Sequence, residues 1–239
     1  DQFRDVGVAL APDLSLAQWP ARAFQFAGLG FVAVTVSKEP RALTAEVAEW
    51  IRLTAGSGLV PFTIPIDEPR TPDAWSAVER LAAAARAGGS GSGRFLYAVT
   101  DVPRQAYQSV DLFISPFAVT QRDQAQRRAW TYNGTPPWAG AMIVDTHGAA
   151  MRTWGWIGFR WDVPVWYVWD GLYWHDRHNR RRRNLAPMGG APVDVARSAI
   201  TFDDGDDRGN LDGALALPPR PDEPLACAPT LRMLALRRG

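Results

Sequence analysis

Two adjacent carboxyl residues, Asp67 and Glu68, follow directly after the apolar run Leu59–Ile66. Neighbouring carboxylates repel each other, so one of the two is pushed toward its protonated form. A carboxyl group that keeps its proton near neutral pH can act as a general acid. The same spacing also fits a structural role, in which the pair starts a turn before Pro69 or one carboxylate pairs with Arg70.

Polar residues also follow two later apolar runs. Asn133 comes after Arg128–Tyr132, and Asp170 comes after Pro164–Trp169. In (β/α)-barrels the active site lies at the C-terminal ends of the strands. If the chain forms such a barrel, we expect these residues and the carboxyl pair to share one rim.

Tryptophan is unusually frequent, with 11 residues in the chain. Large aromatic rings fill protein cores, but their flat faces also stack on the C–H faces of sugar rings. Packing is the expected role for most members of the cluster. The group Trp166, Trp169 and Trp174, next to the polar strand end, is predicted to include a sugar-stacking platform with Tyr132 and Asn133 on the same rim. The clustered tryptophans are Trp130, Trp138, Trp154, Trp156, Trp161, Trp166, Trp169 and Trp174.

Apolar runs rich in β-forming residues alternate with helical patterns, which is typical of a parallel sheet built from β-α units. A chain of 239 residues is close to the ~250 residues of a (β/α)8 barrel. The sequence therefore predicts an α/β fold of the TIM-barrel type, with an incomplete or irregular N-terminal part. The expected strands are Asp5–Leu10, Gly30–Ser37, Leu59–Ile66, Arg94–Thr100, Val110–Ser115, Arg128–Tyr132, Pro164–Trp169 and Gly213–Leu217.

Three helices are expected between these strands. Leu43–Thr54 repeats its apolar residues at helical spacing, and Thr71 with Pro72 begins a second helix in the usual order of cap and proline. Asp145–Trp161 is the third, with Asp145 either capping it or reaching the site. We expect its apolar stripe to pack against the barrel.

The whole chain, 1–239, is expected to form one domain. Its pattern breaks down at about 175–210, which predicts a long loop over one barrel end, because loops above ~12–15 residues are usually functional or disordered. The charged runs Arg180–Arg183 and Asp203–Asp207 fall in or near this segment and are expected to be solvated.

The composition argues against several functional classes. Lys and Arg total 26 against 25 Asp and Glu, and a net charge of +1 gives no field that would attract nucleic acid. Cys227 is the single cysteine and forms no internal disulfide, and no apolar run reaches the ~18 residues of a membrane span. His147, His175 and His178 lack metal-ligand spacing. We therefore expect a soluble protein with no metal and no cofactor. Oligomeric state is not indicated.

Several motifs together resemble one family. The order and spacing of these motifs is similar to that of bacterial barrel proteins that carry domain of unknown function 4091, which are related to family 123 glycoside hydrolases. The likeness extends from about Gly28 to the C-terminus. The motifs are Asp67-Glu68-Pro69, Tyr132-Asn133-Gly134 followed by Pro136-Pro137, Arg152-Thr153-Trp154-Gly155-Trp156, Trp166-Tyr167-Val168-Trp169 and Gly209–Pro218.

This resemblance implies a β-N-acetylgalactosaminidase-like activity on an oligosaccharide or polysaccharide. In the implied retaining, substrate-assisted mechanism, the 2-acetamido oxygen of the substrate attacks the anomeric carbon. Glu68 would protonate the leaving oxygen and later deprotonate water, and Asp67 would orient the acetamido group. The expected substrate-binding residues are Tyr132, Asn133, Asp145, Trp166, Trp169, Asp170 and Trp174. A chain that opens at Asp1 without Met fits a mature secreted or cell-surface form, or a fragment.

Two alternatives remain open. Glu68 could serve as acid/base with Asp170 as nucleophile, an arrangement that needs the carboxyl groups ~5–5.5 Å apart. The chain could also be a carbohydrate-binding barrel without activity, in which Glu68 lies out of reach of the glycosidic oxygen.

Overall fold

The structure is a computed structural model that describes residues 9, 13–123, 129–142, 146–147, 149–172, 213–217 and 227–237. It contains two compact units. The first unit comprises Ala11–Ser115 and Val119–Trp130, and the second comprises Asp1–Leu10, Pro116–Ala118 and Thr131–Gly239. Each unit is treated by itself below.

A parallel sheet forms the centre of the first unit. Its strands are β1 (Phe31–Ala33), β2 (Val60–Thr63), β3 (Leu96–Val99) and β4 (Leu112–Ser115), followed by the start of β5 (Ala129–Tyr132). Strand β1 pairs in parallel with β2, β2 with β3, and β3 with β4. All residues of β3 and β4 are buried, as expected for strands covered on both faces. This confirms the predicted apolar runs as strands, although each is shorter than its run.

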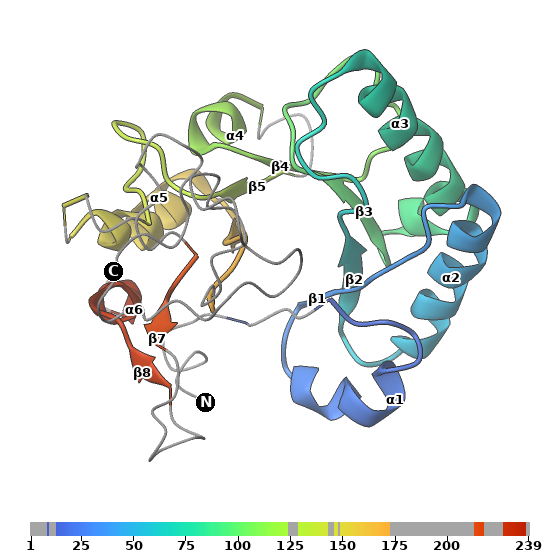
Figure 1. Cartoon of the computed structure of the whole chain (residues 1–239), viewed down its shortest axis with the longest axis horizontal. Helices are drawn as coiled ribbons and strands as arrows, with labels where there is room; N and C mark the ends of the chain where they lie inside the picture. The colour runs from blue at the N-terminus through green and yellow to red at the C-terminus, as the bar shows by residue number, and fades with distance from the viewer. Residues whose placement is uncertain are drawn as a thin grey trace, which may run out of the picture. The chain divides into compact units, whose positions relative to one another are not determined.

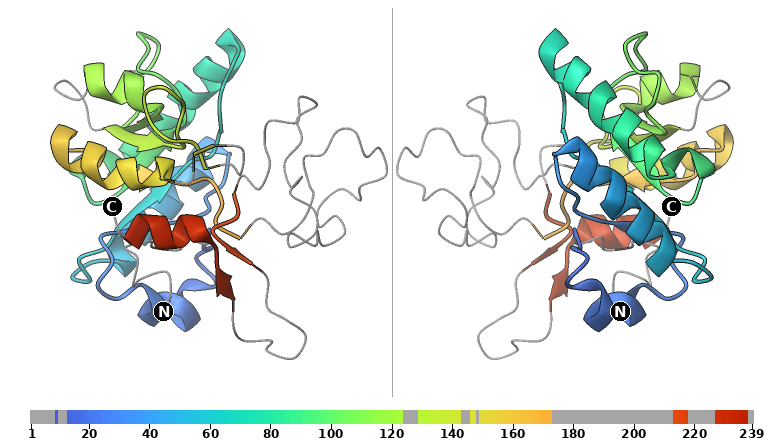
Figure 2. Two further views of the ribbon diagram at one scale, coloured as in Figure 1. Left: turned by 90° about the vertical axis from the view of Figure 1, so that its left-hand side faces the viewer. Right: turned by 90° about the vertical axis from the view of Figure 1, so that its right-hand side faces the viewer.

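Two long helices cover this sheet. They are α2 (Pro40–Leu53) and α3 (Pro72–Ala87), which lie side by side (Figures 1 and 2). Each begins with a proline after a residue whose side chain caps the helix: Glu39 accepts from Ala42 N, and Thr71 accepts from Ala74 N. The predicted cap at Thr71 is confirmed.

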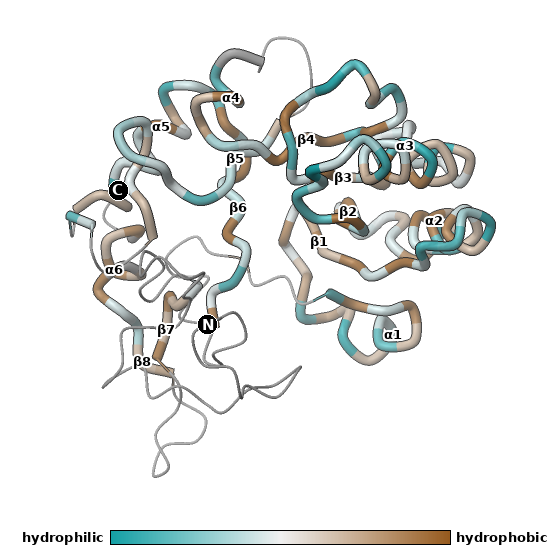
Figure 3. The backbone as a smooth tube through the Cα atoms, turned by 45° about the horizontal axis from the view of Figure 1, so that its top comes forward, coloured by the Kyte–Doolittle hydropathy of each residue, from teal (hydrophilic) through white to brown (hydrophobic). Residues whose placement is uncertain are grey.

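The buried faces of these helices follow helical spacing, and hydrophilic residues lie on the opposite side of the helices (Figure 3). The indole of Trp130 in β5 adds edge contacts with Phe31 at 4.8 Å and Phe62 at 5.0 Å between ring centroids. Shorter elements of the first unit are α1 (Trp19–Arg22), η2 (Ala23–Phe26) and η3 (Ser90–Ser92). The buried helix residues are Leu43, Val47 and Trp50 in α2 and Val78, Leu81, Ala82 and Ala85 in α3.

The second unit contains the end of β5, which pairs in parallel with β6 (Trp166–Tyr167). A 3-10 turn, η4 (Ala150–Arg152), leads into α5 (Thr153–Trp161). The pair β7 (Ala216–Leu217) and β8 (Ala228–Pro229) precedes α6 (Leu231–Arg237). Helix α4 (Phe117–Asp123) crosses the boundary between the units.

The predicted (β/α)8 barrel is wrong for the described residues. The parallel sheet there has six strands in the order β1 to β6, and its end strands β1 and β6 do not pair with each other. Gly213–Leu217, the expected last barrel strand, supplies only β7, which runs antiparallel to β8. In the same run, Ala214 forms an isolated antiparallel bridge with Leu172. An apolar run predicts a strand but neither its partner nor its direction, which explains the error.

Two further expectations meet different outcomes. The helix predicted over Asp145–Trp161 begins only at Ala150, as a 3-10 turn, before α5. The expected strand Asp5–Leu10, apart from Ala9, and the expected loop at about 175–210 lie outside the described residues. The single-domain organisation over 1–239 stays a prediction.

Candidate functional site

The carboxyl pair lies just beyond β2, at the end of the first unit's sheet where the parallel strands terminate. Thr100, the residue directly after β3, joins the two acids. Its hydroxyl donates to Asp67 Oδ1 at 2.5 Å and accepts from the backbone N–H of Glu68 at 2.7 Å. Thr100 is 6% exposed. One buried hydroxyl therefore links both predicted catalytic residues to the neighbouring strand end.

The backbone at Glu68 has a φ of +39°. Residues with a Cβ rarely adopt this left-handed conformation, which costs on the order of 1–3 kcal/mol and is concentrated at functional sites. The hydrogen bond from Glu68 N to Thr100 holds the backbone in this state.

The Glu68 side chain points toward solvent. Its Oε2 accepts from Arg70 Nη2 at 2.7 Å, and the side chains of Arg70 and Glu68 are 82% and 43% exposed. The pairing that the sequence offered as a structural role is thus present. Exposed ion pairs contribute only about 0–1 kcal/mol, so Arg70 can leave Glu68 at low cost.

A second polar cluster, formed by Asp101, Arg104 and Tyr107, stabilises the loop after Thr100. The Asp101 carboxylate accepts from Arg104 Nε at 2.6 Å and from the Tyr107 hydroxyl at 2.8 Å, and Arg104 lies over the Trp75 ring at 4.2 Å. Ser115 Oγ, at the end of β4, donates to the Asp101 carbonyl at 2.6 Å.

Two members of this cluster, Tyr107 and Arg104, have a raised pKa. Burial raises the pKa of Tyr107, and the hydrogen bond to Asp101 raises it further. The hydrogen bond to Asp101 also raises the pKa of Arg104. The sequence assigns no site role to Thr100, the last residue of the expected strand Arg94–Thr100, or to Asp101, the residue after it. The strand-end argument that singles out Asp67 applies equally to Asp101.

In the second unit, Asn133 follows β5 and also adopts a left-handed backbone, with φ +49°. Its carbonyl accepts from Trp166 Nε1 at 2.9 Å, and its N–H donates to Tyr167 O at 3.3 Å. The side-chain Oδ1 is buried and has no hydrogen-bond partner in the described part of the chain. Tyr132, the last residue of β5, is half-buried.

Trp166 is used for packing. Its ring stacks on Trp154, with centroids 4.8 Å apart and planes 7° from parallel, and it also stacks on Phe117 at 6.2 Å. Trp154 Nε1 donates to Gly140 O at 2.7 Å. The role of core filler that the sequence favoured for most tryptophans therefore applies to Trp154 and, in large part, to Trp166.

The remaining predicted residues divide by location. Trp169 and Asp170 are half-buried, and Asp170 Oδ1 accepts from Leu172 N at 2.8 Å, as in a turn. Asp145 and Trp174 lie outside the described residues. Asp67 and Glu68 belong to the first unit, and Tyr132, Asn133, Trp166, Trp169 and Asp170 belong to the second. Their common rim stays a prediction.

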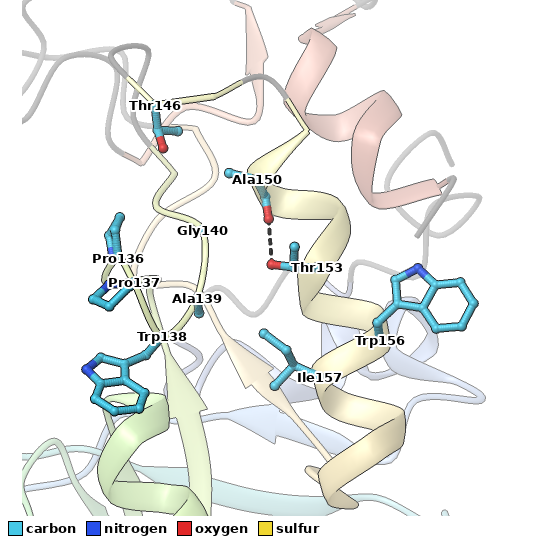
Figure 4. A pocket seen from close by; sticks show the side chains of 10 residues that line it. All are labelled: Pro136, Pro137, Trp138, Ala139, Gly140, Thr146, Ala150, Thr153, Trp156 and Ile157. Carbon is cyan, nitrogen blue, oxygen red and sulfur yellow. Dashed lines mark hydrogen bonds between the residues drawn. The ribbon is translucent and has the colours of Figure 1, made fainter.

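A groove in the second unit carries exposed indoles that sequence analysis did not assign to a site. It has a volume of about 580 Å³ and lies between the Pro136–Gly140 segment and α5, and none of the described residues that line it is charged (Figure 4). Trp138 is 58% and Trp156 66% exposed. In Figure 4 the Ile157 side chain points toward the Trp138 side of the groove, whereas the Trp156 indole points away from Pro136 and Pro137.

The described residues contain no group of three or more His, Cys, Asp or Glu that could hold a metal ion, and none of their helices is long and apolar enough to cross a membrane. His147 Nδ1 accepts from Ala149 N at 3.3 Å. His175, His178, Arg180–Arg183 and Asp203–Asp207 lie outside the described residues.

Comparison with known proteins gives no identification. No protein-family model matches the sequence, and no curated protein is significantly similar to it. The resemblance to the proteins with domain of unknown function 4091 therefore stays a prediction.

Proposed function

We propose that this protein is a retaining glycoside hydrolase that cleaves a β-linked N-acetylhexosaminide of the N-acetylgalactosamine type with assistance from the substrate. The observation that supports this best is the Asp67–Thr100–Glu68 arrangement at the end of β2 and β3. The ends of parallel strands are where α/β enzymes place catalytic groups.

Each acid has a separate task in the proposed reaction. Glu68 gives its proton to the departing glycosidic oxygen while the acetamido oxygen bonds to the anomeric carbon, which forms an oxazoline. The carboxylate of Glu68 then takes a proton from water while the water oxygen bonds to the anomeric carbon, and the bond from that carbon to the oxazoline oxygen breaks. Asp67 accepts a hydrogen bond from the acetamido N–H and stabilises the positive charge that develops there. If Oε2 is the oxygen that carries the proton, Arg70 must first leave it.

The first test is hydrolysis of aryl glycosides with and without a 2-acetamido group. We expect product only from the acetamido sugars. Glu68→Gln should then lower the rate on a substrate with a poor leaving group by about 10²–10⁴-fold, because it removes the transferable proton and keeps the shape of the side chain.

Glu49→Gln is the matched control. Glu49 is also paired with an arginine at the surface, Arg52 at 2.6 Å, but lies on α2, and its loss should leave the rate unchanged. Near-normal turnover by Glu68→Gln on the poor leaving group would remove Glu68 from the mechanism.

The Arg70–Glu68 ion pair favours a second candidate, a carbohydrate-binding protein without activity, because Arg70 engages Glu68 Oε2 and favours the ionised carboxylate over the protonated acid that the reaction needs. This candidate predicts that acetamido sugars bind without being cleaved at any pH. Turnover that depends on Glu68 would exclude it.

A further inference from the structure

We propose that Thr100 is a positioning residue, whose hydroxyl orients the Asp67 carboxylate and fixes the backbone of Glu68 so that both acids face the substrate in the required geometry. The proposal rests on the glycosidase function above. Thr100 contacts neither the substrate nor the reacting atoms in this scheme and acts only through Asp67 and Glu68.

The Thr100 hydroxyl donates one hydrogen bond and accepts another. A threonine hydroxyl has one proton to donate and lone pairs that accept. The proton goes to Asp67 Oδ1, since the contact with Glu68 is made by a backbone N–H, which can only donate. Loss of the hydroxyl therefore releases the Asp67 carboxylate and leaves the Glu68 N–H without this acceptor.

Thr100 is itself held firmly. It is β-branched, which restricts its χ1 rotamers, and it is buried directly after β3. The next residue, Asp101, is fixed by Arg104, Tyr107 and Ser115. The rigid end of β3 therefore fixes the positions of Asp67 and Glu68, which lie in the loop after β2. A preorganised site needs this kind of support.

The two carboxylate oxygens of Asp67 have different roles in this arrangement. Thr100 is the one hydrogen-bond partner that the described residues give to this side chain, and it engages Oδ1. Oδ2 is then the oxygen left to accept the acetamido N–H. A displacement of about 1 Å of such an acceptor can cost on the order of 10²-fold in rate, because reacting groups must be aligned.

The test compares Thr100→Val, which keeps the shape and removes the hydroxyl, with Thr100→Ser, which keeps the hydroxyl. On an acetamido aryl glycoside, Thr100→Val should lower kcat by about 10- to 100-fold with little change in KM, and Thr100→Ser should retain most of the wild-type kcat. Equal losses in the two variants, or none in Thr100→Val, would overturn the proposal.

A double-mutant cycle asks whether Thr100 acts through Asp67. If it does, Thr100→Val should cost much less in the Asp67→Asn background than in the wild type. A full and additive loss would contradict the proposal. Thr100→Ala replaces Thr100→Val if the valine variant does not fold, as judged by its thermal unfolding.

Crystal structures separate failure of this inference from failure of the proposed function. If the wild type cleaves no glycoside, the proposed function is wrong, but the positions of Asp67 Oδ1 and of the Glu68 backbone in Thr100→Val still test the positioning role. A changed Asp67 rotamer or Glu68 φ supports it. An unchanged loop overturns it.

Discussion

The indoles of Trp154 and Trp166 stack nearly parallel, with planes 7° apart and centroids separated by 4.8 Å. Trp166 Nε1 is also engaged, because it donates to Asn133 O. Because Trp154 lies in α5 and Trp166 in β6, the stacked rings pack this helix against this strand and stabilise the second unit.

Trp166→Ala should therefore destabilise the protein by about 3 kcal/mol, since it leaves a cavity next to Trp154 and removes a hydrogen bond. Chemical unfolding measures this loss. Trp156→Ala is the control from the same helix region: with 66% of the residue exposed, its effect should stay within about 0.5 kcal/mol. Equal costs for the two variants would contradict the packing role of Trp166.

Gly88→Ala should also be costly. A Cβ at this position would lie 2.4 Å from the backbone oxygen of Thr44 and 2.9 Å from Val47 Cβ, so α3 would have to move away from α2. We expect a loss of about 2 kcal/mol, in the range for overpacking. A Cβ at Gly30 meets nothing within 4 Å, so Gly30→Ala serves as the control and should be almost neutral. A neutral Gly88→Ala would show that the two helices are packed less closely.

Two buried tyrosines should respond in opposite ways to loss of the hydroxyl. The Tyr97 hydroxyl has no hydrogen-bond partner among the described residues, whereas the Tyr107 hydroxyl donates to Asp101. Tyr97→Phe should be neutral or stabilising, and Tyr107→Phe should cost about 1–3 kcal/mol because the bond is made to a charged acceptor. Denaturant unfolding at neutral pH compares them, and the reverse order would be evidence against both assignments.

Alkaline pH should destabilise the fold through the same residues. Burial raises the pKa of both Tyr97 and Tyr107 in the folded state. Above pH about 10, the unfolded chain loses these protons while the folded protein keeps them, so stability falls as pH rises, by about 1.4 kcal/mol per pH unit for each tyrosine. Each Phe variant should reduce this slope. A stability that does not change from pH 9 to 11 would disprove the linkage.

Asp67→Asn and Asp170→Asn distinguish the two hydrolytic mechanisms. Under substrate assistance, Asp67→Asn should lower the rate by about 10²-fold or more, as expected for loss of one preorganised electrostatic contact, and Asp170→Asn should be milder. Direct displacement reverses this order, and azide should then rescue a small-side-chain variant of Asp170. Rate constants for both variants on one substrate decide the matter.

The helices and parallel strands of the first unit could be predicted because their signals are local. Apolar spacing indicated α2 and α3, and Thr71 with Pro72 marked the start of α3. The apolar spacing predicts that this helix begins at Leu43, three residues after its observed start at Pro40, because apolar spacing takes no account of the capping Glu39 and the proline that follows it.

The errors concern relationships between distant segments. Nothing in the run Gly213–Leu217 shows that β7 pairs antiparallel with β8, and chain spacing does not show that Thr100 bonds to residues 32 and 33 positions earlier. Aromatic composition likewise did not tell which tryptophan stacks on another tryptophan and which one faces solvent.

The left-handed backbone at Glu68 has a consequence for protein engineering. Glycine has no Cβ and adopts this conformation at little cost, so Glu68→Gly would relieve the strain that the wild-type residue carries. A selection for heat resistance alone would therefore favour glycine at position 68. A selection that demanded turnover as well would keep glutamate, so comparing the survivors of the two regimes would show whether the strain at this residue is maintained for activity.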